Sequence, residues 1–338
     1  MHQVSIILPA RNEEQHIQAC LRSILAQDYP GIREVLVIDG SSEDRTRELV
    51  AAAAKIDSRI RLLDNPKRTV TAAVNAGFAA ARCPLIVRMD AHADYAADYI
   101  SQCVKALNET GAAVVGGRTT PVYGCTRLAQ AIGALHESPF GIRAARFRRA
   151  GQGGFVDTVW CGAYRAAALD EVGRCVREQL TRAEDIELHA RLRAAGHRIY
   201  LSPDIQARYC PRDSVPGLLG QSFANGRGVV QALAVNRRAV SLRHFVPAAF
   251  VCSLLAAGCL AACGPPWAWA FPAVAGSYAL ANLCFSLRVG VRRGAGVGIL
   301  VPPLYLAVHL AYGLGSLLGM LLYLPRAAVL SVRQLLQR

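Results

Sequence analysis

A carboxylate and an imidazole stand two residues apart in the segment Asp90-Ala91-His92, which follows the mostly apolar run 85–89. In an extended segment, side chains two residues apart lie on the same face. Aspartate together with histidine is a ligand set that suits Mn²⁺ and is acceptable for Mg²⁺. The pair therefore predicts a divalent metal site. The alternative is that Asp90 only hydrogen-bonds to the backbone of its own turn.

Two common phosphate-binding motifs are missing from the sequence. No GxGxxG follows the first apolar run, and no GxxxxGK[ST] occurs anywhere in the chain. The dinucleotide fingerprint and the P-loop are therefore excluded. A divalent cation is another means of holding a diphosphate, because it bridges phosphate oxygens. The predicted metal site would serve this purpose.

Polar segments also follow the first and second apolar runs. Asp39 stands where acids of nucleotide-binding sheets accept hydrogen bonds from a ribose or a base. It could equally be the turn residue before Gly40, with Ser42 or Asp44 capping the next helix. The segment 9–13 would bring Arg11 or backbone N–H groups near a nucleotide, with Asn12 as a helix cap.

Further along the chain, Glu184 and Asp185 open a predicted helix that runs to about Gly196. Adjacent carboxylates point in different directions on a helix, so one can form structural contacts within the protein while the other faces a cleft as a general base. The alternative is that both are ordinary partners of the helix dipole. The loop 155–164 offers the Trp160 ring and the flexible Gly162 for sugar or acceptor contact, or else simply packs in the core.

Short β-branched runs alternate with helical patterns over the first 110 residues. This alternation predicts an α/β fold with a doubly wound, mostly parallel sheet. Ligands of such sheets bind beyond the carboxyl ends of the strands, where the polar segments lie. The predicted strands are Val4–Leu8, Glu34–Ile38, Ile60–Leu63 and Leu85–Met89, and the predicted helices are Glu13–Gln27, Glu43–Lys55 and Thr69–Ala81, with Ser42 or Thr69 as caps.

The C-terminal part of the chain has the composition of a membrane domain. The 338 residues are 53% hydrophobic and 18% charged, and no Asp or Glu follows Asp213. The excess of arginine flanks apolar runs, which is typical of a membrane surface and not of a nucleic-acid site. Three runs are long enough to cross a bilayer: Phe245–Cys263, Trp267–Leu287 and Val297–Leu324. We therefore predict a catalytic domain at 1–213, a juxtamembrane segment at 214–244 and a membrane domain at 245–338.

The charges around these runs predict an orientation. The opening residues have no signal peptide, so we expect the front domain in the cytosol. The uncharged hairpin 264–266 would lie outside and the arginines at 288, 292 and 293 inside. The third run is followed by arginines at 326, 333 and 338. Either the positive-inside rule is broken there, or the segment re-enters and the last dozen residues lie on the inner surface.

Taken together, these motifs resemble the family 2 glycosyltransferases with the GT-A fold, and most closely the membrane-attached exopolysaccharide glucosyltransferases of the succinoglycan-biosynthesis type. The similarity covers about the first 250 residues. The matching stretches are 5–14, 37–44, 65–68, 72–77, 88–93, 156–159, 162–165, 184–185, 211–212, 226–228 and 242–247.

The resemblance implies a role for each group of residues. Asp90 and His92 stand where the family binds Mn²⁺ or Mg²⁺, and Asp185, beside Glu184, stands where the acceptor hydroxyl is activated. The displacement would be inverting, with no covalent intermediate. Residues implied in nucleotide-sugar binding are Pro9, Arg11, Asn12, Glu13, Asp39, Lys67, Asp90 and Ala91, and those implied near the acceptor or diphosphate are Trp160, Gly162, Ala163 and Arg227.

The sequence also departs from the family pattern. Ile38-Asp39 replaces an acidic doublet, and His92 replaces a second carboxylate. The QxxRW box of processive synthases is absent, since Gln221 and Arg227 are six apart and Gly228 stands where tryptophan would be. Processive synthesis is therefore disfavoured, while Arg227 could still hold the diphosphate. The basic run at 143, 146, 148 and 149 would suit a phosphate-bearing acceptor or form a solvated loop.

The predicted function is transfer of a hexose, taken as glucose from UDP-glucose, to a polyprenyl-diphosphate-linked saccharide. The enzyme would be a multi-pass protein of a bacterial-type inner membrane and could work beside other polysaccharide-assembly enzymes. One alternative is a polyprenyl-phosphate sugar transferase that makes an activated lipid-sugar. The other is an inactive, membrane-anchored nucleotide-sugar-binding module.

Overall fold

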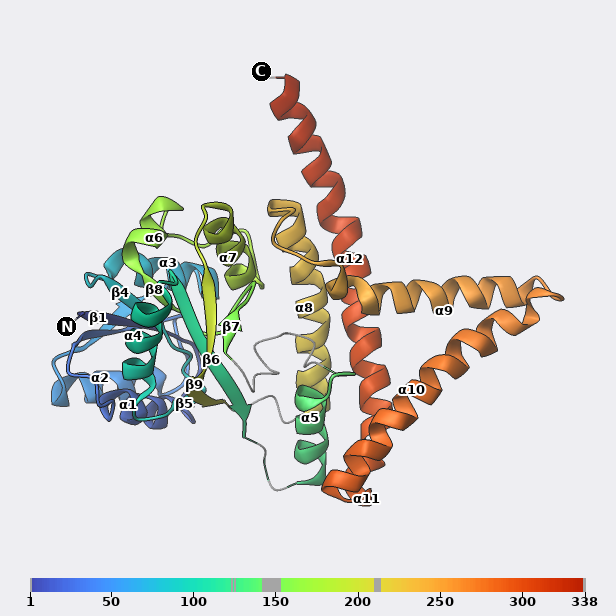
Figure 1. The fold of residues 1–338 in the computed structure, drawn as a ribbon, viewed down its shortest axis with the longest axis horizontal. Coiled ribbons are helices and arrows are strands. Elements are labelled where there is room, and N and C mark those ends of the chain that lie inside the picture. Colours follow the sequence, from blue (N-terminus) through green and yellow to red (C-terminus); the bar gives the residue numbers. More distant parts are fainter. Residues whose placement is uncertain (1, 123, 125, 142–152, 210–213, 337–338) are drawn as a thin grey trace. The chain divides into compact units, whose positions relative to one another are not determined.

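The computed structural model describes residues 2–122, 124, 126–141, 153–209 and 214–336, with side chains described up to 325. The chain forms two compact units (Figure 1). The first comprises residues 1–122 and 146–210, and the second comprises 123–145 and 211–338. The segment 123–145 thus groups with the C-terminal part of the chain, and not with the residues on either side of it. The basic run at 143–149 lies outside the described residues.

The first unit is built on a mixed sheet whose strand order is β3-β2-β1-β4-β8-β6-β9-β5. Its first half is parallel and confirms the four predicted strands: β1 (Val4–Ala10), β2 (Ile32–Asp39), β3 (Ile60–Asp64) and β4 (Leu85–Arg88). Its second half contains β5 (Ala93–Tyr95), β6 (Val114–Pro121), β7 (Gly154–Phe155), β8 (Ala163–Arg165) and β9 (Ile199–Tyr209). In this half β6 and β9 pair in parallel, whereas the other pairs, including the β4–β8 pair that joins the two halves, are antiparallel.

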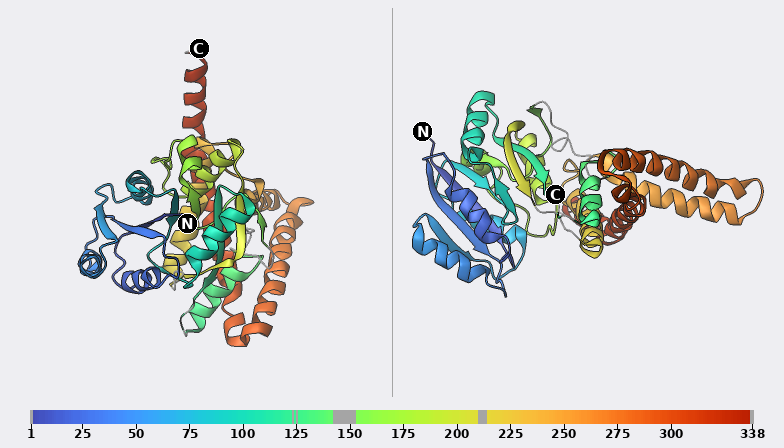
Figure 2. Two further views of the ribbon diagram at one scale, coloured as in Figure 1. Left: turned by 60° about the vertical axis from the view of Figure 1, so that its left-hand side comes forward. Right: turned by 90° about the horizontal axis from the view of Figure 1, so that it is seen from below.

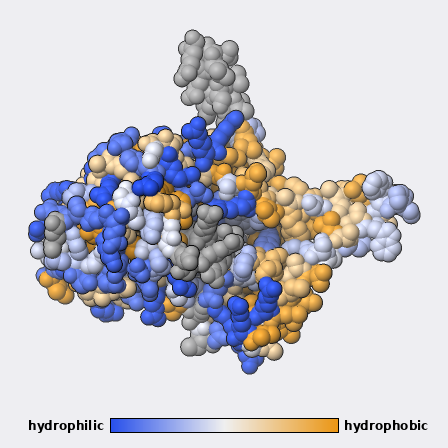
Figure 3. Space-filling model, viewed as in Figure 1, coloured by the Kyte–Doolittle hydropathy of each residue, from blue (hydrophilic) through white to orange (hydrophobic). Residues whose placement is uncertain are grey.

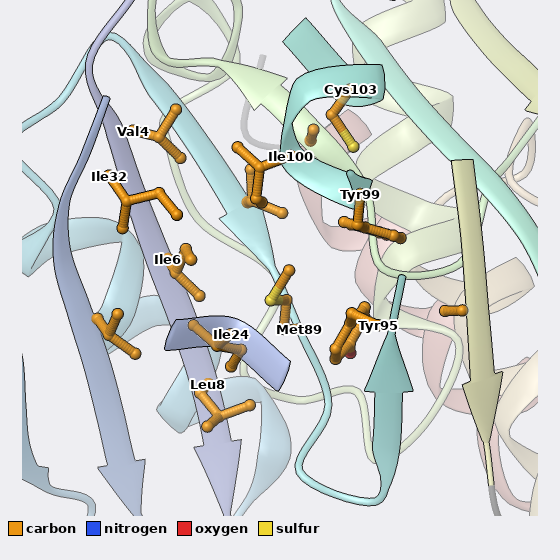
Figure 4. Packing of buried hydrophobic residues seen from close by; sticks show 14 of the residues in the cluster. Val4, Ile6, Leu8, Ile24, Ile32, Met89, Tyr95, Tyr99, Ile100 and Cys103 are labelled. Atoms are coloured by element: carbon orange, nitrogen blue, oxygen red, sulfur yellow. The ribbon is translucent and has the colours of Figure 1, made fainter. Parts of the chain in front are cut away.

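Helices cover both faces of this sheet (Figures 1 and 2). Alternate residues of β1 point to opposite faces: Ile6 packs in one apolar cluster and Ile7 in the other. The first cluster, seen from close by in Figure 4, joins β1 to α1 (Ile17–Leu25) and α4 (Tyr99–Thr110). The second joins the sheet to α3 (Val70–Ala80), α6 (Ala166–Glu171) and α7 (Glu184–Ala194). The helix α2 (Thr46–Ile56) contributes Val50 to the first cluster.

One predicted helix cap is confirmed and two are wrong. The side chain of Thr69 accepts a hydrogen bond from Ala72 N and caps α3. Asn12 does not cap α1, which begins four residues later than predicted, because Asn12 has a left-handed backbone (φ 54°) and its Oδ1 accepts from Glu43 N. Ser42 does not cap α2, which begins at Thr46, and its hydroxyl bonds to Asp39. The other candidate, Asp44, accepts a hydrogen bond from Thr46 N at 3.0 Å. At Asn12, a contact with a loop 31 positions away has replaced local capping.

The second unit contains the apolar helices. Around a small core lie α5 (Arg127–Glu137), α8 (Val215–Val235), α11 (Ala295–Gly298) and α12 (Val301–Leu336). The helices α9 (Val246–Ala262) and α10 (Ala270–Arg293) form an antiparallel hairpin arm (Figures 1 and 2). Two short 3₁₀ turns, Leu242–Phe245 and Trp267–Trp269, precede them.

Three segments of the described chain are helical, long and apolar enough to cross a membrane: Leu242–Ala262, Trp267–Arg293 and Ala295–Pro325. The three predicted apolar runs are therefore confirmed as helices of spanning length. Apolar surface is gathered along α10 (Figure 3), which has the exposed side chains Leu280, Leu283, Leu287 and Val291.

Candidate active site

Parallel pairing of the first strands brings their polar tails to one edge of the sheet. Ala10 at the end of β1 pairs with Asp39 at the end of β2, and Ile7 pairs with Arg88 at the end of β4. Asp90 and His92 follow β4 in the next turn. The predicted nucleotide and metal residues of these three strand ends are thus neighbours at the sheet edge.

An arginine that the sequence did not single out lies among the predicted catalytic carboxylates. Arg88 Nη1 donates to Glu184 Oε1 at 3.0 Å, and Arg88 Nε lies 3.5 Å from Asp90 Oδ1. The side chains of Arg88, Asp90 and Glu184 are only 13%, 15% and 11% exposed. Asp90 and Glu184 are 94 positions apart in the sequence, and Arg88 joins them. The predicted metal carboxylate and the predicted catalytic doublet therefore belong to one cluster.

The charges of this cluster set the protonation states. Burial opposes ionisation of Asp90, but Arg88 and His92 together hold the pKa of Asp90 below its usual range. The pKa of the Asp185 carboxyl is raised to about 6 by burial and by the negative charge of Glu184, while Arg88 acts in the opposite direction. Near neutral pH, Asp90 is ionised and Asp185 is a carboxylate that readily takes up a proton. These are the states needed for a metal ligand and a general base.

Backbone contacts fix the turn that carries Asp90. Its N–H donates to the Tyr95 hydroxyl at 2.6 Å, and that hydroxyl lies 3.3 Å from the Asp90 carbonyl. Cys20 Sγ donates to the same carbonyl at 3.6 Å. The backbone groups of Asp90 thus hold the turn, while its carboxylate lies beside Arg88.

The residues at this edge fit a divalent cation whose coordination is completed by substrate. His92 is 40% exposed, with Nδ1 lying 3.4 Å from Glu13 Oε1. Among the described residues, no group of three or more His, Cys, Asp or Glu side chains is placed to hold a metal. Mg²⁺ is commonly bound by one or two protein ligands together with phosphate oxygens and water. Asp90 and His92 would hold such an ion once a diphosphate is present.

The loops after β1 and β2 are interlocked. Asn12 N donates to Ser42 Oγ at 2.9 Å, and Glu43 N donates to Asn12 Oδ1 at 2.9 Å. The buried Asp39 carboxylate accepts from Ser42 N at 3.1 Å and from Arg47 Nη1 at 2.9 Å. Asp39 thus acts as a turn residue in this structure, and any hydrogen bond from its carboxylate to a nucleotide would be formed in addition to these contacts.

The other predicted nucleotide residues differ in how exposed they are. Pro9 is partly exposed at the end of β1, and Arg11 is exposed and lies over Gly40, where a Cβ would meet the Arg11 Cβ at 3.1 Å. Lys67 is exposed and paired with Glu178 at 2.6 Å. Ala91 is almost completely buried, so only its backbone could contact a ligand.

The predicted acceptor residues fall into different environments. Gly162 O accepts from Arg88 N at 3.0 Å, so this glycine supports the carboxylate cluster through its backbone. Trp160 is partly exposed next to it. Ala163 is fully buried in β8 and pairs with Val87 and Val115. The Ala163 side chain therefore packs in the core, which was the alternative to acceptor contact. Arg227 lies on α8 in the second unit.

A second feature that the sequence did not reveal is a buried histidine one turn beyond Asp185. His189 Nδ1 lies 2.8 Å from Thr158 Oγ1, and its Nε2 lies 3.0 Å from the Tyr164 hydroxyl. Burial, with a smaller contribution from Arg193, lowers the pKa of His189 to about 3. The imidazole is therefore neutral, and its bonds anchor the first turns of α7 to β8 and to the preceding loop.

Comparison with known proteins identifies the class to which this fold and site belong. Residues 5–173 match the family described as Glycosyl transferase family 2. The chain therefore belongs to glycosyltransferase family 2, and its first unit is the GT-A catalytic fold of that family.

Two individual proteins are similar to this chain over most of its length. The chain is 30% identical over 314 residues to the succinoglycan biosynthesis protein ExoA of Rhizobium meliloti (strain 1021), covering 92% of each chain. It is 26% identical over 263 residues to the dolichyl N-acetyl-alpha-D-glucosaminyl phosphate 3-beta-D-2,3-diacetamido-2,3-dideoxy-beta-D-glucuronosyltransferase of Methanococcus voltae, covering 75% of this chain and 81% of that protein.

A solved structure supports the fold. The mannosyltransferase PcManGT from Pyrobaculum calidifontis, in complex with GDP-Man and Mn²⁺, superposes with a TM-score of 0.60 at 20% identity, covering 95% of this chain and 87% of that one.

Proposed function

We propose that this glycosyltransferase moves a hexose, glucose from UDP-glucose, to a polyprenyl-diphosphate-linked saccharide during exopolysaccharide assembly. The observation that carries the chemistry is the cluster in which Arg88 joins Asp90 to Glu184, next to Asp185 with its raised pKa. The choice of product rests on similarity along 92% of the chain to a succinoglycan biosynthesis protein. Other polysaccharide-assembly enzymes would supply the acceptor and use the product.

The residues of the cluster divide the reaction between them. Asp185 accepts the proton of the acceptor hydroxyl as its oxygen attacks the anomeric carbon, and the bond to the nucleoside diphosphate breaks on the opposite face, inverting the configuration. A divalent ion at Asp90 and His92 would neutralise the charge that develops on the departing diphosphate. Glu184 holds Arg88 and keeps it beside Asp90. Asp39, Arg11, Asn12, Glu13 and Lys67 would surround the nucleotide.

Membrane attachment fits a lipid-linked acceptor. In the part of the chain that the structure describes, three helices are long and apolar enough to cross a membrane. An enzyme and a polyprenyl-linked substrate confined to one plane meet at a high effective concentration. We place the catalytic unit on the cytosolic side of a bacterial-type inner membrane, where nucleotide sugars are available.

The test is a screen of radiolabelled UDP-glucose, UDP-galactose and GDP-mannose against membranes that carry polyprenyl-diphosphate-linked saccharides, with products identified by mass. We expect metal-dependent transfer of a single hexose that Asp185→Asn abolishes. Glu109→Gln is the matched control, since it makes the same carboxylate-to-amide change on the exposed surface of α4. Transfer that persists in Asp185→Asn would contradict the assigned base.

The acceptor distinguishes the second candidate function. A similar protein of Methanococcus voltae is named for transfer to a dolichyl-phosphate-linked sugar. Transfer to polyprenyl phosphate alone, without a saccharide, would instead identify a maker of activated lipid-sugars. Absence of transfer and of donor hydrolysis with every pair tested would point to a binding module.

A further inference from the structure

The third apolar helix is packed lengthwise against a helix that precedes the membrane segments. A Cβ on Gly315 of α12 would come within 2.1 Å of the Phe223 carbonyl of α8, and one on Gly319 within 3.1 Å of the Arg227 carbonyl. Between these points, Ser316 Oγ donates to Gly226 O at 3.3 Å. The contacts advance together along both helices, so α8 and α12 run side by side in the same direction.

This contact covers the middle of the candidate span 295–325. Earlier along the pair, Leu218 of α8 packs with Leu304, Tyr305 and Val308 of α12. If residues 304–319 crossed the hydrocarbon, α8 would have to cross beside them. Within the described chain, α8 does not have the composition of a spanning helix.

The sequence of α8 explains why it cannot cross. The stretch that faces α12 carries five polar side chains: Gln221, Ser222, Asn225, Arg227 and Gln231. A single arginine near the bilayer centre costs about 2.5–3.5 kcal/mol on insertion scales, before the amides are counted. Crossing by α12 would therefore require a strongly unfavourable crossing by α8.

The beginning of α12 is held by polar groups as well. Arg293 at the end of α10 pairs with Glu137 of α5 at 2.6 Å and donates to Gln130 O at 3.1 Å. Arg127 at the start of α5 lies against Gly296. These charged groups, at the two ends of α5 and at the end of α10, belong at an aqueous surface.

The face of α12 opposite α8 is apolar. Its exposed side chains recur at helical spacing on one side: Leu306, Leu314, Leu318, Leu321, Leu322 and Leu324. A helix with one face on protein and an apolar stripe on the other is suited to lie in the membrane interface, with the stripe toward the acyl chains.

The arginines complete the pattern. Ten arginines and no acids follow Asp213. If only α9 and α10 cross, all ten lie on the side of the catalytic unit, facing the anionic leaflet. If α12 also crosses, Arg326, Arg333 and Arg338 lie outside, against the positive-inside rule.

We propose that α12 does not cross the membrane, but lies with α5 and α8 on the anionic lipid surface of the cytosolic leaflet, so that among the described residues only the α9–α10 hairpin spans it. Both chain termini are then on the cytosolic side. This topology is independent of the donor and acceptor chemistry proposed above, and its tests do not measure activity.

The first test uses reporters fused to the full chain in a bacterial host. Green fluorescent protein after residue 338 should fluoresce, and alkaline phosphatase at the same position should be inactive. Phosphatase inserted between Gly264 and Pro265, at the hairpin tip, should be active and serves as the matched control. An active phosphatase after residue 338 would overturn the proposal.

The second test measures depth along α12, which separates a surface helix from a re-entrant one. Spin labels are placed at Ile299→Cys, Leu306→Cys, Leu314→Cys and Leu321→Cys in a variant without native cysteines whose melting temperature is unchanged. The outer two sites are about 30 Å apart along a helix. Similar accessibility to an apolar relaxant at all four sites supports the proposal, whereas much deeper labels at 306 and 314 refute it. If the cysteine-free chain does not fold, the reporter fusions still decide whether α12 crosses the membrane.

Discussion

Replacing Arg88 by glutamine tests whether this residue sets the protonation of the catalytic base. Arg88 is the cation that opposes the rise in the pKa of Asp185, which stands at about 6. A pKa near 6 means that the fraction of active base, and with it kcat/KM, falls about tenfold between a plateau above pH 7 and pH 5. Without the arginine, burial and the charge of Glu184 act unopposed. The acidic limb of the profile should then move up by about one pH unit, the lower end of what an adjacent arginine does to a carboxylate.

The assay is kcat/KM for labelled donor from pH 5 to 9, at saturating divalent metal. With that displacement, and with each enzyme scaled to its own plateau, Arg88→Gln is less active than the wild type by about twofold at pH 7 and about fivefold at pH 6. The control is Arg45→Gln, which removes an exposed arginine paired with Glu48 on α2. A profile of Arg88→Gln that coincides with the wild type, or a limb displaced to lower pH, would refute the reasoning. A uniform loss at every pH would assign Arg88 to positioning Asp90 alone.

Four other substitutions probe the same structure. Asp90→Ala should abolish Mn²⁺-dependent UDP binding in titration calorimetry, and unaltered affinity would reject the metal assignment. Asp185→Asn should raise the free energy of unfolding at pH 8 by up to about 3 kcal/mol. The reason is that folding raises the pKa of the Asp185 carboxyl from 3.8 to about 6, so its ionised form destabilises the folded state above pH 6 and not below pH 4. An equal effect at pH 8 and pH 4 in thermal melts would disprove this. His189→Leu should cost about 1–3 kcal/mol near pH 8 by leaving the buried Tyr164 hydroxyl and the partly buried Thr158 hydroxyl without this partner. The deficit should shrink below pH 6.5, where unfolded wild type binds a proton that the buried imidazole does not. Gly226→Ala should lower the melting temperature in detergent, because its Cβ would lie 2.1 Å from a backbone oxygen of α12, whereas Gly220→Ala on the same helix meets nothing within 4 Å and should be neutral or stabilising.

The sequence predicted the parts of the fold that depend on local pattern. The four strands of the parallel half, the helix that starts at Glu184, and the three apolar helices all follow from periodicity and composition. The polar segments after β1, β2 and β4 also met at one edge, because parallel strands carry their ends to the same side.

What the sequence could not predict depends on contacts between distant segments. Arg88 ends a short buried strand, and its charge was the one available signal, but its partner Glu184 lies 96 positions away. Asn12 was predicted as a cap from its neighbours, whereas a contact across 31 positions decides its conformation. The grouping of residues 123–145 with the C-terminal helices likewise depends on packing and not on local propensity.

The interlocked loops after β1 and β2 bear on how the enzyme would discriminate between nucleotides. Asn12, Ser42 and Glu43 bond to one another across the two loops before any ligand arrives. If these loops surround the nucleotide as proposed, they lose little conformational entropy on binding, so affinity comes at a small ordering cost. They would also adapt poorly to a base of another size, since any accommodation must break hydrogen bonds in both loops. Changing the preferred nucleotide would thus require coordinated substitutions in two segments about thirty residues apart.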